Sequence, residues 1–180
     1  MPFRLLLVCT GNVCRSPMAE RLLVAGLAER SGEGGRGVEV SSAGTGALVG
    51  EAMTPETADL VSRHGGDPTG HRARQVTPQL LAEADLVLAL TREHRAAVAQ
   101  LHPRVLRRLL TLREAGRLAP LVAVEGLPEP VEDRWRALVP AMLPPGGACR
   151  CPARATTTSS TRSGVTRTST SGAPRRCCRR

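Results

Sequence analysis

Residues 3–17 read FRLLLVCTGNVCRSP, an apolar run followed by a short polar segment. The run 3–8 is continuous and rich in Leu and Val, which is typical of a strand buried on both faces of a sheet. From Pro17 onward the apolar residues have helical spacing. Residues 9–16 are therefore predicted to form a turn that connects a strand to a helix.

This turn has the composition of an anion-binding loop that also carries a nucleophile. Gly11 permits a tight or positive-φ backbone, so that successive amide groups converge on one anion, and the start of the next helix adds partial positive charge. These groups favour the thiolate of Cys9, the nucleophilic form of cysteine. Arg15 supplies a planar guanidinium that can bind two phosphate oxygens at once. In the alternative without a binding site, Cys9 is a small buried apolar residue and Arg15 is an ordinary solvated side chain. Ser16, Pro17 and the preceding strand favour a phosphate site over this alternative.

At this loop the chain resembles the low-molecular-weight protein tyrosine phosphatases. Residues 9–17 match the family signature Cys-x-Gly-Asn-x-Cys-Arg-Ser-Pro in full. The stretches 41–45 (SSAGT), 71–74 (HRAR) and 84–90 (ADLVLAL) resemble the family's second strand, connecting loop and third strand. The resemblance covers residues 3 to about 142.

The resemblance implies a hydrolase that dephosphorylates phosphotyrosine in proteins through a cysteinyl-phosphate, with no metal and no cofactor. Cys9 would attack phosphorus, Arg15 and the loop amides would hold the phosphate oxygens, and Ser16 would hydrogen-bond the departing sulfur. Asn12, Ser42 and His71 would support the loop, although a surface-loop role for His71 and a strand-end role for Ser42 remain alternatives from the residues alone. The phosphate-binding residues implied in this way are Thr10, Gly11, Asn12, Val13, Cys14, Arg15 and Ser16.

Strand and helix patterns alternate along the chain. This order predicts a single-domain α/β fold with a doubly wound parallel sheet of about four strands and an active loop at a strand's carboxyl end. The family resemblance implies that this fold is similar to the phosphotyrosine phosphatase I fold. The expected strands are 3–8, 38–42, 86–90 and 105–111, and the expected helices are about 17–30, 54–64, one from Thr77-Pro78, 91–102 and one after Pro130. A Gly-rich turn is expected over 31–37.

Composition limits the other function classes. The net charge of +9 is concentrated in residues 149–180, which hold eight arginines and no acid, so that residues 1–148 carry 17 basic and 16 acidic residues. Phe3 and Trp135 are the only aromatic residues, so the chain lacks a base-stacking platform and no specific nucleic-acid partner is expected. No apolar stretch suits a membrane span or secretory signal, and we expect a cytoplasmic protein whose partner is a phosphotyrosine-bearing protein.

The C-terminal part departs from the family pattern. Family members carry an Asp-Pro-Tyr or similar segment there, whose Asp protonates the leaving group, whereas this chain has no Asp or Glu after Asp133. Asp67-Pro68 is interpreted as a turn before His71, and the carboxylates between Glu129 and Asp133 as structural residues at a helix start. No general acid is therefore assigned, and impaired turnover is expected.

We interpret residues 1–142 as the phosphatase-like domain and residues 143–180 as a non-homologous, basic, disordered tail. Reading residues 156–170 in a shifted frame, with wobble bases chosen to fit, gives a segment that contains Asp-Pro-Phe, which suggests a frameshift near residues 142–148. Two alternative functions are also compatible with the phosphate-binding loop. One is a catalytically crippled phosphoresidue-binding protein, and the other is a protein arginine phosphatase, although arginine phosphatases carry Thr where this chain has Val13. An arsenate reductase is disfavoured because no cysteine lies between residues 15 and 148 to resolve an arsenylated nucleophile.

Overall fold

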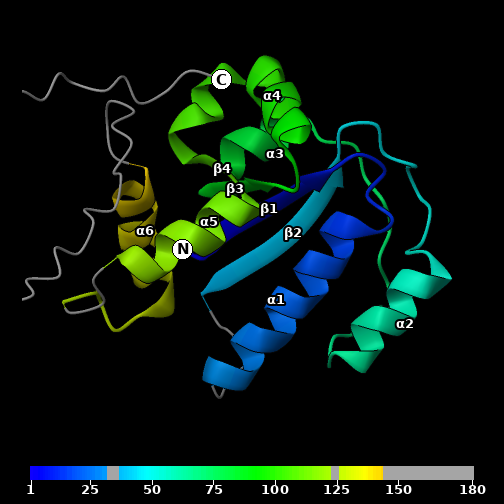
Figure 1. Cartoon of the computed structure of the whole chain (residues 1–180), viewed down its shortest axis with the longest axis horizontal. Helices are drawn as coiled ribbons and strands as arrows, with labels where there is room; N and C mark the ends of the chain where they lie inside the picture. Colours follow the sequence, from blue (N-terminus) through cyan, green and yellow to red (C-terminus); the bar gives the residue numbers. More distant parts are fainter. Residues whose placement is uncertain (32–36, 123–125, 144–180) are drawn as a thin grey trace, which may run out of the picture. The chain divides into compact units, whose positions relative to one another are not determined.

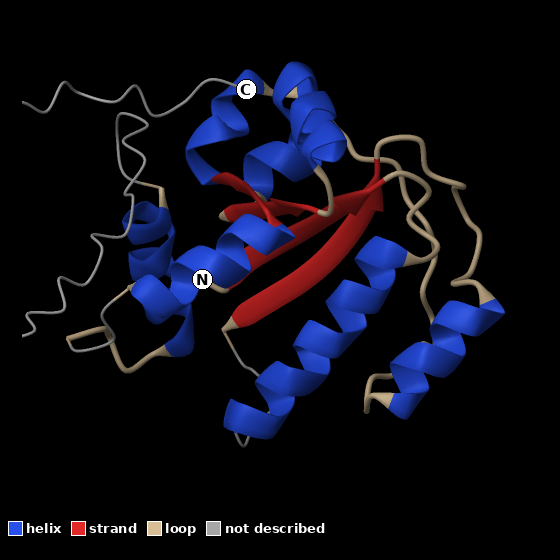
Figure 2. Cartoon of the chain, viewed as in Figure 1, coloured by secondary structure: helices blue, strands red, loops and turns tan. Residues whose placement is uncertain are grey.

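Four parallel strands form the central sheet, in the order β2-β1-β3-β4 (Figures 1 and 2). The structure, a computed structural model, describes residues 1–31, 37–122 and 126–143, all within one unit, Met1–Ala148. The elements in chain order are β1 Phe3–Cys9, α1 Arg15–Ser31, β2 Val38–Gly44, α2 Pro55–Arg63, α3 Pro78–Glu83, β3 Leu86–Ala89, α4 Arg92–Leu101, the 3₁₀ helix η1 Pro103–Arg108, β4 Leu109–Thr111, α5 Leu112–Leu118, the 3₁₀ turn η2 Ala119–Leu121 and α6 Val131–Met142. The predicted doubly wound parallel α/β fold is confirmed.

Both faces of the sheet are covered, which explains the uninterrupted apolar run in β1. Phe3, Leu5 and Leu7 point to one face, in a cluster that receives side chains of α1, α5 and α6. Leu6 and Val8 point to the other face, in a cluster that receives side chains of α3, α4 and η1. Side chains of successive strand residues alternate between faces, so a strand covered on both sides must be apolar at nearly every position.

Threonine caps fix the points at which the chain leaves the carboxyl ends of the strands. Thr91 follows β3 and caps α4, and Thr111 ends β4 and caps α5 with a capping box completed by Glu114. A threonine side chain at this position accepts a hydrogen bond from an otherwise unpaired amide of the first helical turn. As a result, both helices begin at the same edge of the sheet as the end of β1.

Two sequence expectations need correction. The fourth strand was expected over 105–111, but β4 covers only Leu109–Thr111, and the residues before it form η1. Pro103 suits the first turn of that helix, and Val105 is fully buried against the core. The helix α5 was not expected, and it packs on the β1 face that also contacts α1.

Helix α6 ties the last described segment to the start of the chain. Trp135 packs against Phe3 with ring centroids 5.6 Å apart, and Arg136 donates a hydrogen bond to the carbonyl oxygen of Met1. All of the predicted tail, 143–180, except Leu143, and most of the predicted Gly-rich turn, 31–37, lie outside the described residues. None of the described helices is long and apolar enough to cross a membrane.

Candidate active site

Cys9 ends β1 at the edge of the sheet where the parallel strands terminate. Its side chain is buried, and Sγ lies 2.9 Å from the Oγ of Ser16, in the first turn of α1. The Cys9 carbonyl accepts a hydrogen bond from the amide of Thr45, which follows β2. Two neighbouring strands therefore fix the position of this thiol.

Carbonyl groups of the loop between β1 and α1 are bonded from outside the loop. Gly46 N donates to the carbonyl of Thr10, and Leu48 N donates to that of Gly11 at 3.0 Å. The carbonyl of Val13 accepts from the amide of Thr54, the N-cap residue of α2, at 3.0 Å. Because these carbonyl groups are turned outward, the N–H groups of the loop are available to converge on an anion.

Asn12 has the unusual backbone conformation in this loop, with φ 55° and a fully buried side chain. Its Nδ2 donates to Ser16 Oγ at 3.0 Å and to Ser42 Oγ at 2.8 Å, and its Oδ1 accepts from the amide of Arg74 at 2.8 Å. Of the two conformations that the sequence allowed for Gly11, a tight backbone or a positive φ, the positive φ is adopted by Asn12 and not by Gly11. Asparagine tolerates the left-handed region better than other non-glycine residues.

The two other predicted support residues contact Asn12 directly. His71 is buried, and its Nε2 donates to the carbonyl of Asn12 at 2.7 Å. Because a carbonyl oxygen only accepts, this ring nitrogen carries a proton. Arg74 adds a connection, since its Nε donates to the carbonyl of Ser42 at 2.8 Å. The sequence did not single out Arg74.

The remaining loop residues surround this framework. Arg15 is exposed at the first position of α1, and its Nη2 donates to Thr10 Oγ1 at 3.4 Å. Cys14 Sγ lies 3.5 Å from the hydroxyl of Thr54, the cap of α2. Val13 is half-buried. All the predicted site residues thus belong to one local cluster.

His94 is a member of this cluster that sequence reasoning missed. It is buried at the start of α4, with Nε2 2.8 Å from Thr10 Oγ1 and Nδ1 3.0 Å from Thr91 Oγ1. Burial, and next the charge of Arg15, lower the pKa of His94 below its ordinary value of 6.5, so the ring is neutral at pH 7. Since Thr10 Oγ1 accepts from Arg15, its proton is free for Nε2, and Nδ1–H then donates to Thr91.

The sequence signal for His94 was available, although it is weak. Thr91 and His94 have the spacing of a capping residue and the third residue of a helix, directly after a predicted strand. Parallel topology brings that strand end to the edge that holds Cys9. A polar first turn at this edge was therefore a candidate neighbour of the loop.

Two of the carboxylates interpreted as structural, Glu132 and Asp133, lie at the opposite edge of the sheet. Glu132 is next to Gly37, directly before β2, and Asp133 pairs with Arg136, which binds the carbonyl of Met1 before β1. Both strands run from these residues toward the Cys9 edge. Within the described ranges, no group of three or more His, Cys, Asp and Glu side chains could hold a metal ion.

Comparison with known proteins gives consistent matches. The family model "Low molecular weight phosphotyrosine protein phosphatase" matches residues 4–125. Low molecular weight protein-tyrosine phosphatase A of Mycobacterium bovis is 46% identical over 100 residues, which are 56% of this chain and 60% of that protein. The chain spans 60% to 63% of the length of the curated relatives it matches.

Two solved structures share the fold. The tyrosine phosphatase amsI of Erwinia amylovora aligns with a TM-score of 0.54 and 28% identity, covering 79% of this chain and 87% of that one. The YwlE arginine phosphatase of Geobacillus stearothermophilus aligns with a TM-score of 0.55 and 29% identity, covering 78% of this chain and 86% of that one.

Proposed function

Because the chain belongs to the low molecular weight phosphotyrosine protein phosphatase family, we propose that it hydrolyses phosphotyrosine in proteins through a covalent phosphate on Cys9. The observation that carries this proposal is the 2.9 Å pairing of Cys9 Sγ with Ser16 Oγ, between the end of β1 and the helix that begins with Arg15. This pairing supports the proposal, because a nucleophile, a hydroxyl partner and a cation at one turn are the groups that covalent phosphate transfer requires.

In the first step the Cys9 thiolate attacks phosphorus. An S–P bond forms, the bond between phosphorus and the tyrosine oxygen breaks, and the electron pair leaves on the phenolate oxygen. The three other phosphate oxygens bind the amides of residues 10–16 and the guanidinium of Arg15. No metal takes part in this step as we propose it.

In the second step water attacks phosphorus, the S–P bond breaks, and its electron pair returns to sulfur. The Ser16 hydroxyl stabilises the departing thiolate. Asn12 Nδ2 donates to Ser16 Oγ, so the hydroxyl proton of Ser16 has two acceptors, Cys9 Sγ at 2.9 Å and the Ala43 carbonyl at 3.5 Å. The shorter contact favours donation to Sγ. The side chains of Asn12, Ser42 and His71 act by positioning, since their hydrogen bonds hold the loop whose amides bind the phosphate.

Turnover of phosphotyrosine is impaired in this chain, because no Asp or Glu follows Asp133. A phenolate with a high pKa leaves slowly unless an acid protonates it, and loss of a positioned acid typically lowers the rate by about 10² to 10⁴-fold. Glu132 and Asp133 are at the other edge of the sheet. At the Cys9 edge, a hydrogen bond from Thr91 lowers the pKa of Glu93, and Glu114 pairs with Arg95 and accepts from the Thr111 amide, so we assign neither as the acid. The frameshift hypothesis supplies the reason, and resequencing of the coding DNA around codons 142–148 tests it.

Leaving-group dependence tests the mechanism. We expect measurable hydrolysis of dinitrophenyl phosphate, whose anion leaves without protonation, and hydrolysis of a phosphotyrosine peptide about 10² to 10⁴-fold slower than by a frame-corrected chain. Cys9→Ser should abolish turnover, whereas Cys14→Ser should retain substantial activity. A trapped phosphate on any residue other than Cys9, or equal rates for the two chains on the peptide, would contradict the scheme.

Phosphoarginine is the second candidate substrate, favoured by the similarity to the YwlE arginine phosphatase. We prefer phosphotyrosine because the half-buried Val13 of the loop offers no hydroxyl to a guanidinium leaving group. Matched peptides carrying phosphotyrosine or phosphoarginine decide between them, and faster phosphoarginine hydrolysis would overturn our choice. A cytoplasmic location stays a prediction, which cell fractionation would test.

A further inference from the structure

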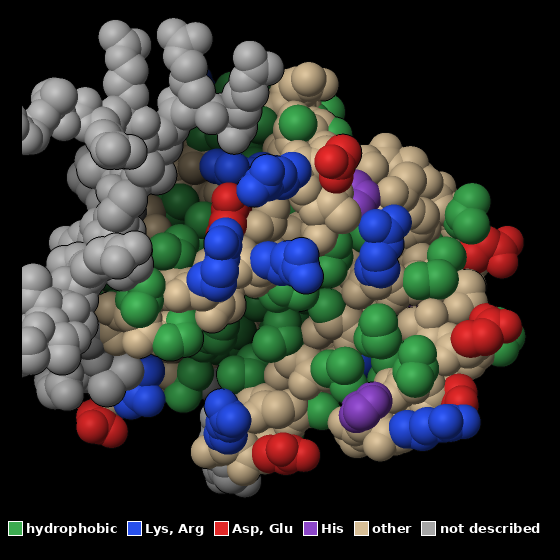
Figure 3. Space-filling model, in the orientation of Figure 1, with side chains coloured by type: hydrophobic (Ala, Val, Ile, Leu, Met, Phe, Trp, Pro, Cys, Tyr) green, Lys and Arg blue, Asp and Glu red, His purple; other side chains and the backbone are tan. Residues whose placement is uncertain are grey.

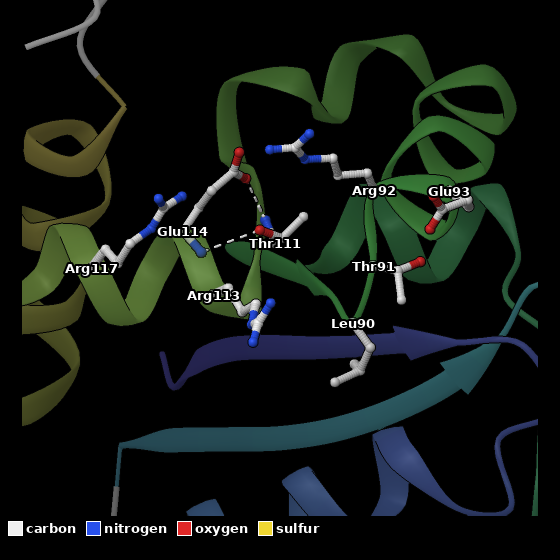
Figure 4. Close-up of a pocket in the computed structure, with 8 residues that line it drawn as sticks. All are labelled: Leu90, Thr91, Arg92, Glu93, Thr111, Arg113, Glu114 and Arg117. Carbon is white, nitrogen blue, oxygen red and sulfur yellow. Dashed lines mark hydrogen bonds between the residues drawn. The ribbon is translucent and has the colours of Figure 1, made fainter.

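A cavity of about 670 Å³ lies beside the ends of β3 and β4, where Leu90, Thr91 and Thr111 line it (Figure 4). Because β1, β3 and β4 are parallel neighbours, Cys9 ends β1 at the same edge of the sheet. It lies between the starts of α4 and α5, and Arg92, Arg113 and Arg117 line it. All three arginines are exposed, and none makes an ion pair with another residue in the described ranges. Figure 3 shows basic side chains gathered on this face of the molecule.

The acidic groups of the cavity do not balance this charge. Glu114 accepts hydrogen bonds from the Thr111 amide at 2.8 Å and pairs with Arg95 at 3.6 Å, so it is already occupied. Glu93 is the other carboxylate of the lining. Three guanidinium groups and two carboxylates line the cavity, and one of these carboxylates is already paired with Arg95 from outside the lining. The cavity therefore retains a positive charge that favours an acidic ligand.

The cavity connects to the proposed catalytic loop through named contacts. Thr91 lines the cavity and bonds His94, which bonds Thr10 in the loop. Leu90 lines both this cavity and a neighbouring apolar groove that includes Arg15. In the sheet, β1 and β4 are separated only by β3, so their ends are about 10 Å apart, a span that about three residues of extended peptide cover.

We propose that this cavity is a subsite for acidic side chains that flank the phosphorylated residue of a protein substrate. The proposal rests on the proposed function, because it places the phosphate at Cys9 and the neighbouring peptide across the ends of β3 and β4. Exposed guanidinium groups contribute little each, so the subsite selects among substrates and does not anchor them alone. Two or three such pairs change affinity by about fivefold.

The test compares two phosphotyrosine peptides that differ only at the flanking positions, with Glu in one and Gln in the other two to four residues from the phosphotyrosine. Binding to the full chain carrying Cys9→Ser is measured by fluorescence anisotropy at low salt and at high salt. We expect the acidic peptide to bind about fivefold more tightly at low salt, and most of this preference to be lost at 1 M salt, where charges are screened beyond about 3 Å.

Two double variants that each lose two positive charges show whether the preference for the acidic peptide arises in the cavity. Arg92→Gln with Arg113→Gln should abolish the preference, whereas Arg104→Gln with Arg107→Gln should retain it, because those exposed arginines of η1 do not line the cavity. Hydrolysis of dinitrophenyl phosphate by the otherwise wild-type chain should be the same in both. Equal losses in the two double variants, no preference, or no binding of either peptide would overturn the subsite.

The outcome separates this subsite from the proposed function. If the wild-type chain fails to hydrolyse any aryl phosphate but the acidic peptide still binds more tightly through Arg92 and Arg113, the catalytic proposal fails and the subsite stands. If aryl phosphates are hydrolysed and the flanking charge makes no difference, the subsite fails and the catalytic proposal stands.

Discussion

Replacing Asn12 should show how strongly the loop depends on one buried amide. Its side chain makes three hydrogen bonds, to Ser16, Ser42 and the amide of Arg74, all between 2.8 and 3.0 Å. A typical hydrogen bond contributes about 1 kcal/mol to the free energy of unfolding. Asn12→Gly keeps the left-handed backbone accessible and removes all three bonds, so we expect a loss of about 3 kcal/mol.

Asn12→Ala removes the same bonds and also forces a Cβ-bearing residue to keep φ 55°. The left-handed conformation costs roughly 1 to 2 kcal/mol for a residue other than glycine, partly offset because alanine restricts the unfolded chain more than glycine does. The alanine variant should therefore be about 1 kcal/mol less stable than the glycine variant. Ser42→Ala, which removes one of the three bonds, should lose about 1 kcal/mol.

Urea unfolding followed by fluorescence measures these differences, because Trp135 is the only tryptophan and packs against Phe3 of β1. Midpoints should shift while the urea dependence stays constant. A glycine variant that loses less than about 1 kcal/mol, or glycine and alanine variants of equal stability, would refute the bond count or the strain argument respectively.

Two further predictions use the same unfolding assay. Burial and Arg15 lower the pKa of His94 below 6.5, so the unfolded chain binds a proton there in a pH range where the folded chain does not; the free energy of unfolding should fall as the pH drops below about 6.5. His94→Gln should remove this pH dependence of the free energy of unfolding, whereas His64→Gln, at an exposed position, should leave it. An unchanged pH profile in His94→Gln would contradict the lowered pKa of His94. Gly44→Ala should lose at least about 2 kcal/mol, because the added Cβ would overlap the carbonyl oxygen of Thr10. Gly46→Ala meets nothing within 4 Å, and a loss as large as that of Gly44→Ala would show that the overlap is not the cause.

The sequence predicted the strands of the sheet correctly where burial on both faces requires a continuous apolar run. Strand β1 is covered on both faces and reads as one apolar run, and the alternation of strands and helices gave the parallel topology. The last strand was harder to predict. Leu106 is exposed and Val105 buried within η1, and over so few residues an apolar run does not distinguish a strand from a 3₁₀ helix.

The sequence predicted the candidate site within the signature, residues 9–17. Asn12 was assigned to loop support, but its positive φ depends on partners at Ser16, Ser42 and Arg74, which only the fold brings together. His94 is further still along the chain, and its contact with Thr10 arises because β1 and β3 are neighbours. Such pairings carry no local pattern, since they depend on strand order.

The described contacts separate the loop from the step that we propose to be impaired, the protonation of the leaving group. Every hydrogen bond described here for the loop comes from residues between Cys9 and His94, so the phosphate binding and S–P bond formation that we propose depend on a part of the chain that precedes residue 143. Our proposal assigns no acid in that part to the leaving group. A frameshift after residue 142 would therefore slow the departure of a poor leaving group and leave the affinity for inorganic phosphate unchanged, because that affinity depends on the loop.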